Sequence, residues 1–186
     1  MSKSLIHAAV RCSSMTGMKV KARILVLSLV CSAMLLAQTQ WSEFSNPKGA
    51  FKVLLPGKPV QNSQSPATFV LSTATGIYLI SYTDAHDGGD AAEIFKNERD
   101  SVLSGMNGKI VQEKDVSLAG YRGRSATFSG NLPSGAITGA VTGELRLFFN
   151  GHRFYMLTAV EPRGSKRQRI ARFLGSFQLM PGTTSH

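Results

Sequence analysis

Four side chains that could bind a metal ion or act in hydrolysis lie within seven residues of one another. They are Asp84, His86, Asp87 and Asp90, on either side of Gly88-Gly89. Clustered carboxylates on a flexible loop suit hard cations such as Ca²⁺, although this spacing is not that of an EF-hand. The alternative, which we favour, is that Asp90 caps a helix and the other side chains are solvated. Asp84, Asp87 and Asp90 therefore stand as candidate metal ligands beside a competing structural interpretation.

Motifs for other chemistry are missing from the sequence. Neither the G-x-S-x-G nucleophile elbow nor the phosphate-binding G-x-x-x-x-G-K-[ST] loop occurs. Beyond the first 37 residues, histidine is present only as His86, His152 and His186. A Ser–His–acid triad can be drawn on paper from almost any such set, so it carries little weight. We expect no catalytic residues and no cofactor, with a hydrolytic site at residues 84–90 as the enzymatic alternative.

Five basic residues within ten positions form the second candidate site, for an anion or a partner. They are Arg163, Lys166, Arg167, Arg169 and Arg172. On a helix, three-residue spacing would bring Lys166, Arg169 and Arg172 close to one face. That face could contact anionic lipid, cell-wall polymer or an acidic protein. The structural alternative is a solvated outer face on a helix that packs through its apolar side.

A third candidate lies at the edge of a predicted strand. Arg122 and Arg124 flank Gly123, directly after Tyr121. These side chains could contact a ligand, although turn geometry also accounts for Gly120 and Gly123.

The net charge of +10, from 21 Lys and Arg against 11 Asp and Glu, would suggest nucleic-acid binding if it were evenly spread. It is not evenly spread. Residues 1–37 carry five basic and no acidic residues, residues 38–161 carry eleven of each, and residues 162–186 carry five basic and no acidic residues. The first block belongs to targeting. Charge-driven binding is therefore expected only in the C-terminal block, and nucleic acid is not an expected partner.

Residues 1–37 have the pattern of an extension followed by an export signal. Lys19, Lys21 and Arg23 precede fourteen uncharged residues, ILVLSLVCSAMLLA at positions 24–37. A signal-peptide core has about 7–15 apolar residues, whereas a membrane-spanning helix needs roughly 20. Cleavage after Ala37, or after Ala33, would release the protein into the periplasm or the medium. The alternative is an uncleaved segment at residues 24–37 that anchors the protein in the inner membrane.

The start of translation stays open among Met1, Met15 and Met18, because the sequence from Met18 is itself a conventional signal-peptide opening. Cys31 is a poor match to a lipid-modified cysteine, since a large residue, valine, precedes it. Both cysteines, Cys12 and Cys31, lie in the leader. The mature domain would therefore have neither thiol catalysis nor a cysteine metal site.

The elements that would position these side chains follow from periodicity and turn residues. Apolar patterning predicts strands over residues 51–55, 68–71, 77–82, 110–118 and 121–128. A helix is predicted from Asp90, with Glu93 three residues later as a capping box, to the glycines at 105 and 108.

The clearest pattern covers residues 137–149, where every odd position is apolar or glycine. It predicts a long strand with one face turned inward and close packing against its glycines. Asn150-Gly151 predicts a type I′ turn into a central strand over residues 154–160. Ser165 is the expected N-cap of a last helix over residues 166–174. Together these elements predict an α+β fold, an antiparallel β-sheet of about seven strands covered by two main helices.

Several landmarks occur in the same order in many small exported bacterial proteins. Trp41 and Phe44 precede Gly49-x-Phe51-x-Val53-x-Leu55-Pro56-Gly57-x-Pro59, and Gly120-Tyr121-Arg122-Gly123-Arg124 and Phe173-x-x-Ser176-Phe177 follow. Over residues 41–179 the chain resembles the PsbP-like (PsbP/Mog-type) superfamily. The resemblance implies an antiparallel sheet covered by helices and used to bind partners, with no shared catalytic site. The chain lacks the Trp that photosynthetic PsbP has shortly after the first-strand Pro, so the photosystem role is not transferred.

The sequence thus predicts an extension plus signal peptide at residues 1–37, one α+β domain at 38–179 and a flexible tail at 180–186. The expected function is that of an exported, non-catalytic envelope domain that binds an envelope protein or an anionic surface. The alternatives are a metal-binding or hydrolytic domain centred on residues 84–90 and a membrane-anchored surface protein. Membrane contact would use the uncleaved leader or the basic C-terminal helix.

Overall fold

The computed structural model describes residues 40–85 and 90–181, so the predicted leader and most of the predicted tail lie outside the described residues. The elements are β1 (Ser42–Asn46), β2 (Phe51–Leu55), β3 (Val60–Gln61), β4 (Thr68–Thr73), β5 (Gly76–Asp84), α2 (Ala91–Ser104), β6 (Lys109–Leu118), β7 (Tyr121–Leu132), β8 (Gly139–Phe149), β9 (Arg153–Pro162), α3 (Gln168–Gly175) and β10 (Gln178–Leu179). Seven strands form an antiparallel sheet in the order β3-β4-β5-β9-β8-β7-β6, and β1-β2-β10 form a second sheet. The predicted α+β fold class is confirmed, and β9 takes the central position predicted for it.

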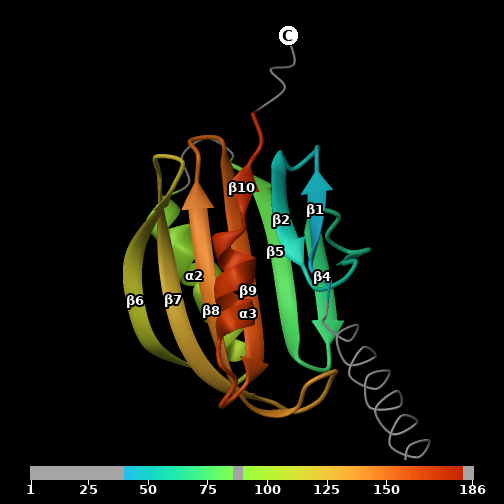
Figure 1. Ribbon diagram of the computed structural model, residues 1–186. Coiled ribbons are helices and arrows are strands. Elements are labelled where there is room, and N and C mark those ends of the chain that lie inside the picture. Colours follow the sequence, from blue (N-terminus) through green and yellow to red (C-terminus); the bar gives the residue numbers. More distant parts are fainter. Residues whose placement is uncertain (1–39, 86–89, 182–186) are drawn as a thin grey trace, which may run out of the picture. The chain divides into compact units, whose positions relative to one another are not determined.

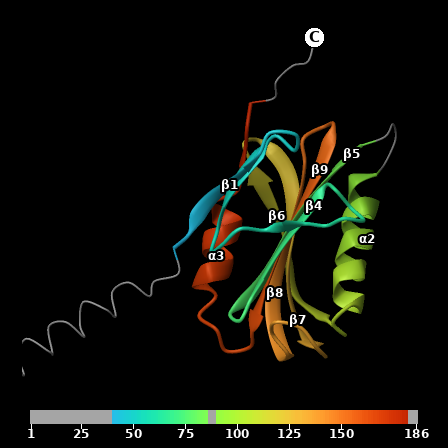
Figure 2. The ribbon, with the colours of Figure 1, turned by 90° about the vertical axis from the view of Figure 1, so that its right-hand side faces the viewer.

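The seven-stranded sheet is the middle of three layers (Figures 1 and 2). Helix α3 and the small sheet cover one face, and helix α2 covers the other. Each face of the sheet therefore meets a different set of side chains, and the two faces offer different kinds of site.

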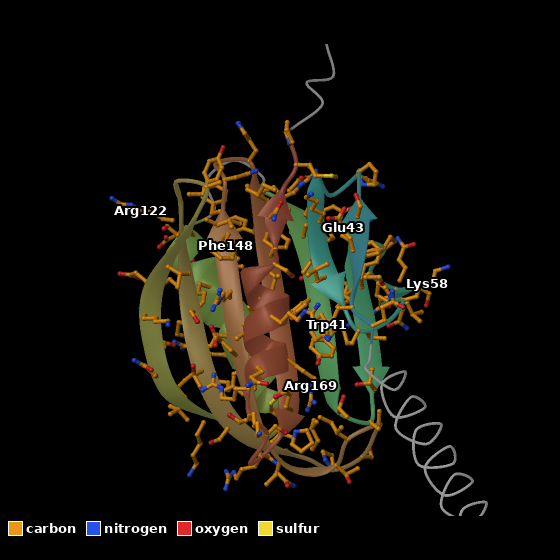
Figure 3. All side chains as sticks on the ribbon, in the orientation of Figure 1. Trp41, Glu43, Lys58, Arg122, Phe148 and Arg169 are labelled. Atoms are coloured by element: carbon orange, nitrogen blue, oxygen red, sulfur yellow. The ribbon has the colours of Figure 1, made fainter. Side chains whose placement is uncertain are left out.

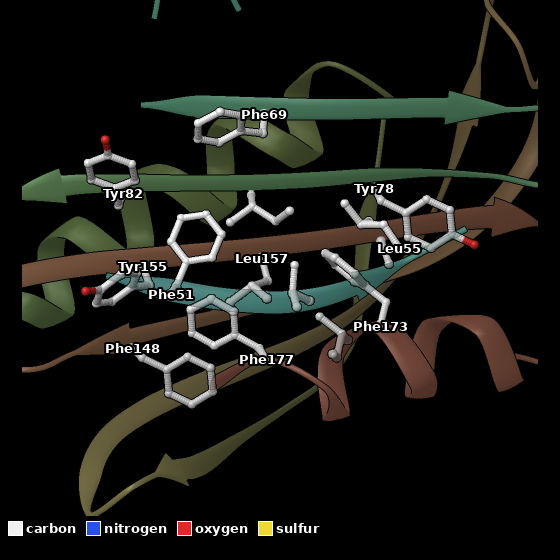
Figure 4. Packing of buried hydrophobic residues seen from close by; sticks show 14 of the residues in the cluster. Phe51, Leu55, Phe69, Tyr78, Tyr82, Phe148, Tyr155, Leu157, Phe173 and Phe177 are labelled. Carbon is white, nitrogen blue, oxygen red and sulfur yellow. The ribbon is translucent and has the colours of Figure 1, made fainter. Parts of the chain in front are cut away.

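Aromatic side chains fill the layer beneath α3 and the small sheet (Figure 4). Phe51 of β2 is fully buried there, and its ring centroid lies 5.6 Å from that of Phe177 and 6.4 Å from that of Tyr155. Burying a phenylalanine side chain contributes about 1.5–3 kcal/mol. This cluster therefore holds β2 and α3 firmly on the sheet.

Strand β8 differs from its prediction in two ways. It begins at Gly139 rather than at residue 137, and both its faces are covered rather than one. Leu147 packs in the cluster with Phe95 of α2, whereas Phe148 is buried on the opposite face. Period-two alternation cannot show whether a second layer covers the other face. The predicted close packing at a glycine is confirmed, because a Cβ on Gly143 would press on the ring of Phe128.

Helix α2 begins where the sequence predicts. Asp90 is its N-cap and accepts a hydrogen bond from the Ala92 N–H at 2.9 Å. Glu93 does not complete the capping box within the described residues. Phe95 is the one residue of this helix that is buried, so α2 rests on the sheet through few side chains. Neither α2 nor α3 is long and apolar enough to cross a membrane, and no other helix is present in the described part of the chain.

The β8–β9 turn corrects a second prediction. The Asn150 N–H donates to the Arg153 carbonyl at 3.2 Å, so Gly151-His152 are the two central residues. Gly151 is the only residue of this turn with a positive φ, 91°. A type I′ turn needs two such residues, so that prediction is wrong.

The start of helix α3 corrects a third prediction. Arg167, rather than Ser165, is the N-cap; it has a left-handed backbone with φ of 55° and makes no side-chain cap bond. The predicted N-cap and the predicted start at residue 166 are therefore wrong. Since the helix begins at Gln168, Lys166 precedes it and does not share a helical face with Arg169 and Arg172.

Candidate binding groove

The carboxylates proposed as metal ligands have structural partners where the structure describes them. Asp84 forms an ion pair with Arg153, and Asp90 caps α2. His86 and Asp87 lie outside the described residues. Over residues 40–85 and 90–181, no group of three His, Cys, Asp or Glu side chains is arranged to hold a metal ion.

Arg153 ties the end of β5 to neighbouring segments. Its guanidinium also donates to the Lys48 carbonyl at 2.9 Å and lies 4.8 Å from the centroid of the Tyr82 ring. The hydrogen bond to Asp84 raises the pKa of Arg153 above its usual value. Asp84 thus acts in the fold as an anchor for this arginine.

Three of the five basic residues near the C-terminus contact other parts of the fold. Arg169 Nε donates to Glu161 Oε1 at 2.9 Å, and Arg167 reaches Glu144 Oε2 at 3.3 Å. The Arg172 guanidinium lies 4.9 Å from the centroid of the Trp41 ring, a cation–π contact. In Figure 3, Trp41 and Arg169 both lie to the right of α3, on the side of the small sheet.

The two carboxylates that receive these arginines are buried on central strands. Glu161 is 1% exposed and Glu144 is 9% exposed. Glu144 also accepts from Arg146 at 2.8 Å and from the Ser125 hydroxyl at 3.0 Å. A buried charge is costly unless it is paired. Arg167 and Arg169 therefore neutralise the interior of the fold.

Sequence reasoning treated the basic residues as a surface and did not connect them to Glu144 and Glu161. A signal was present, because each glutamate interrupts a strand of mostly apolar residues. Such an acid on a central strand predicts a basic partner from the layer above it.

The other two basic residues of the C-terminal segment make no such contacts with the fold. Arg163 and Lys166 are exposed, and neither forms an ion pair or side-chain hydrogen bond with any residue that the structure describes. The structure thus does not bring the five together into one cationic patch.

Tyr78 lies beside the Glu161–Arg169 pair and is fully buried. Its hydroxyl has no hydrogen-bond partner among the described residues. Burial, and then the negative charge of Glu161, raise the pKa of Tyr78 to about 12. The tyrosine therefore stays neutral through the physiological range.

The opposite face of the sheet has a different character, because α2 leaves space beside it. We call this space the α2 groove, a cavity of about 450 Å³ between the first turns of α2 and strands β6 to β9. Phe95 forms part of one side, and Leu147, Phe149 and Phe154 supply apolar surface from the sheet. The Phe149 and Phe154 rings are stacked with centroids 4.2 Å apart. The full lining is Ala91, Ala92, Phe95, Asp115, Val116, Arg122, Gly123, Arg124, Leu147, Phe148, Phe149 and Phe154.

A second recess of about 370 Å³ shares Leu147 and Phe154 with the α2 groove. It also contacts Ile94 and Glu98 of α2, together with the last residues of β5. The amino-terminal half of α2 is thus flanked by two hollows, which follows from its single buried side chain.

The charged residues of the α2 groove differ in whether they form ion pairs. Arg124 pairs with Asp115 at 3.5 Å and with Glu113 at 3.8 Å, and its guanidinium lies 5.5 Å from the centroid of the Phe95 ring. Arg122 is exposed and forms no ion pair or side-chain hydrogen bond with any residue of the described ranges. Figure 3 shows Arg122 projecting from the edge of the molecule. The groove therefore has an apolar interior and one unpaired cation at its rim.

Of the three residues that sequence reasoning singled out on β7, Arg122 and Arg124 line the groove and Tyr121 does not. The aromatic lining was not anticipated. Phe149 and Phe154 have the sequence signature of ordinary core residues, and only the space left beside α2 makes them part of a recess.

Two solved structures are similar to this chain at low identity. PsbP (CyanoP) from Synechocystis sp. PCC 6803 is 8% identical with a TM-score of 0.55, over 77% of this chain and 95% of that chain. A protein from Bacteroides thetaiotaomicron VPI-5482 is 15% identical with a TM-score of 0.51, over 76% of this chain and 49% of that chain. This chain therefore spans about half the length of the Bacteroides protein. No protein-family model matches the sequence, and no curated protein does.

The fold is PsbP-like, as the order of landmarks in the sequence implied. At these identities the likeness concerns the fold alone, because one fold serves many functions. The site has to be judged from its own residues.

Proposed function

We propose that this protein is an exported, non-catalytic domain of the bacterial envelope that binds its ligand or partner in the α2 groove. The observation that carries the proposal is a recess lined by aromatic and aliphatic side chains with the guanidinium of Arg122 at its rim, which has no ion-pair partner among the described residues. Binding sites for small ligands are of this kind: mostly apolar clefts of about 300–1,000 Å³ with a few placed polar groups.

Export is supported by the leader. The basic residues before position 24 and the short apolar run that follows match a signal peptide. We place the mature protein in the periplasm or outside the cell. Inner-membrane anchoring through residues 24–37 is the alternative that fractionation would reveal.

The groove is a better binding site than the three arginines of the C-terminal segment that contact the fold. Arg167 and Arg169 are held by buried glutamates, and Arg172 lies on Trp41. Each of these cations would have to leave a contact in the fold before it could serve an anionic surface. Arg122 can meet a ligand without such a loss.

The localisation half of the proposal is tested on the native protein. The envelope of the host is fractionated, and the amino terminus of the recovered protein is sequenced. We expect a soluble envelope form that begins directly after Ala37 or Ala33. A full-length form that stays with inner membranes after carbonate extraction would contradict it.

The binding half needs a variant that fills the groove without disturbing the core. Ala92 is exposed and lines the groove, so Ala92→Trp places a large ring in it. Asn97→Trp, on an exposed position of α2 that does not line either hollow, is the matched control. We expect native mass spectrometry of envelope-purified protein to find the same bound molecule on the wild type and on Asn97→Trp, but not on Ala92→Trp. If all three forms retain the bound molecule equally, the α2 groove is excluded as its binding site.

A further inference from the structure

We infer that the α2 groove binds a single-chain fatty acid, with the acyl chain in the recess and the carboxylate at Arg122. This inference rests on the proposed function and specifies its ligand. It uses the shape of the recess, the side chains that line it and the charge at its rim.

The apolar part of the ligand would lie against the aromatic surface. Phe95 from α2 and the stacked pair of Phe149 and Phe154 all line the recess, and Leu147 lies in the same buried cluster. Moving an acyl chain from water onto such side chains is favourable for each CH₂ group that is buried. A flexible chain can adapt its shape to the side chains of a recess beside a helix.

The charge at the rim selects the head group. The charged residues of the lining are Arg122, Arg124 and Asp115, which leaves one positive charge in excess. Arg124 and Asp115 are paired with each other, so the excess is carried by Arg122. A planar guanidinium matches a carboxylate with two parallel hydrogen bonds. The rim is therefore complementary to one carboxylate.

A membrane surface fits these residues less well. Many head groups would call for several free cations on one face, since each basic residue near an anionic leaflet contributes little by itself. Of the described residues that line the groove, Arg122 is the one cation without an ion-pair partner. The geometry suits one detached amphiphile rather than a bilayer.

The inference is tested by isothermal titration calorimetry on the mature protein after delipidation. The ligands are dodecanoate, dodecanol and dodecyltrimethylammonium, each kept below its micelle concentration. We expect dodecanoate to bind one molecule per chain, dodecanol about fivefold more weakly and the ammonium compound more weakly still. Fivefold is the upper end of what a solvent-exposed ion pair contributes.

Two variants locate the site within this assay. Arg122→Ala should weaken dodecanoate binding about fivefold and leave dodecanol binding unchanged. Arg163→Ala removes another exposed arginine, one that does not line the groove, and should change neither. Ala92→Trp should weaken both ligands more than tenfold, whereas Asn97→Trp should not. Thermal melting of all four variants checks that they are folded.

Several results would overturn the inference. The inference is wrong if the ammonium compound binds tightly. It is also wrong if Arg122→Ala and Ala92→Trp leave dodecanoate binding unchanged, or if the protein binds only to vesicles of phosphatidylglycerol. A wrong ligand can be distinguished from a wrong binding site. If Ala92→Trp loses its bound molecule in the envelope but the wild type does not bind dodecanoate, the groove is a binding site for something else.

Discussion

Replacement of Arg169 by methionine tests whether the basic residues of the C-terminal segment serve the fold. Methionine keeps much of the apolar length of the arginine stem and removes the guanidinium. The substitution leaves Glu161, which is 1% exposed, without its ion-pair partner. Glu161 Oε2 already has no hydrogen-bond partner in the described residues, so neither oxygen would then be satisfied.

The expected loss of stability can be bounded. Removing one partner of a buried ion pair costs about 3–5 kcal/mol. The predicted loss for Arg169→Met is therefore about 3–5 kcal/mol at pH 7.

Urea unfolding of the wild type and of Arg169→Met at pH 7 measures this loss directly.

Two further variants complete the test. Glu161→Gln/Arg169→Met should recover most of the loss at pH 7, because no buried charge remains. Arg163→Met, at an exposed arginine without an ion-pair partner in the described residues, should change stability by less than about 0.5 kcal/mol. A loss of less than about 1 kcal/mol in Arg169→Met, or a double variant no more stable than Arg169→Met, would refute the reasoning.

Three further predictions probe the fold. Burial raises the pKa of Tyr78 from 10.0 to about 12, so wild-type stability should fall by about 2–3 kcal/mol as the pH rises from 10 through 12. Tyr78→Phe should lack that loss when urea unfolding is followed at alkaline pH. Since the hydroxyl has no hydrogen-bond partner in the described residues, the substitution should change stability by less than about 1 kcal/mol at pH 7. An identical alkaline loss in both proteins would contradict the raised pKa of Tyr78. Asp90→Ala should cost about 1 kcal/mol through loss of the cap on α2, whereas Asp90→Asn should cost less, both measured by urea unfolding. Gly143→Ala should lower the melting temperature by several degrees, because the new methyl group meets the Phe128 ring, while Gly175→Ala has open space and should not lower it; the reverse order would refute the close packing.

Much of the fold is readable from local pattern. The cap at Asp90, the central place of β9 and the close packing at Gly143 each depend on a few neighbouring residues, and all three were predicted. The errors have a common cause. The covering of the second face of β8 and the left-handed backbone of Arg167 depend on contacts with distant segments, which periodicity does not record.

The candidate site was harder to anticipate for the same reason. The α2 groove joins residues from α2, β7, β8 and β9 that are up to 63 positions apart in the chain, from Ala91 to Phe154. Strand register brings Gly123 opposite Phe148, which places Arg122 near Phe149. Sequence pattern identified Arg122 and Arg124 as candidate contacts, but the recess that they line depends on how α2 packs on the sheet.

We propose that binding takes place in the α2 groove and not on the basic C-terminal segment. The most direct measurement is a ¹⁵N–¹H chemical-shift map of the mature domain titrated with monomeric dodecanoate. We expect amide shifts to concentrate in the first turns of α2 and at the ends of β7, β8 and β9 around Arg122, Phe149 and Phe154. Shifts concentrated in residues 163–172, or none at saturating ligand, would contradict it.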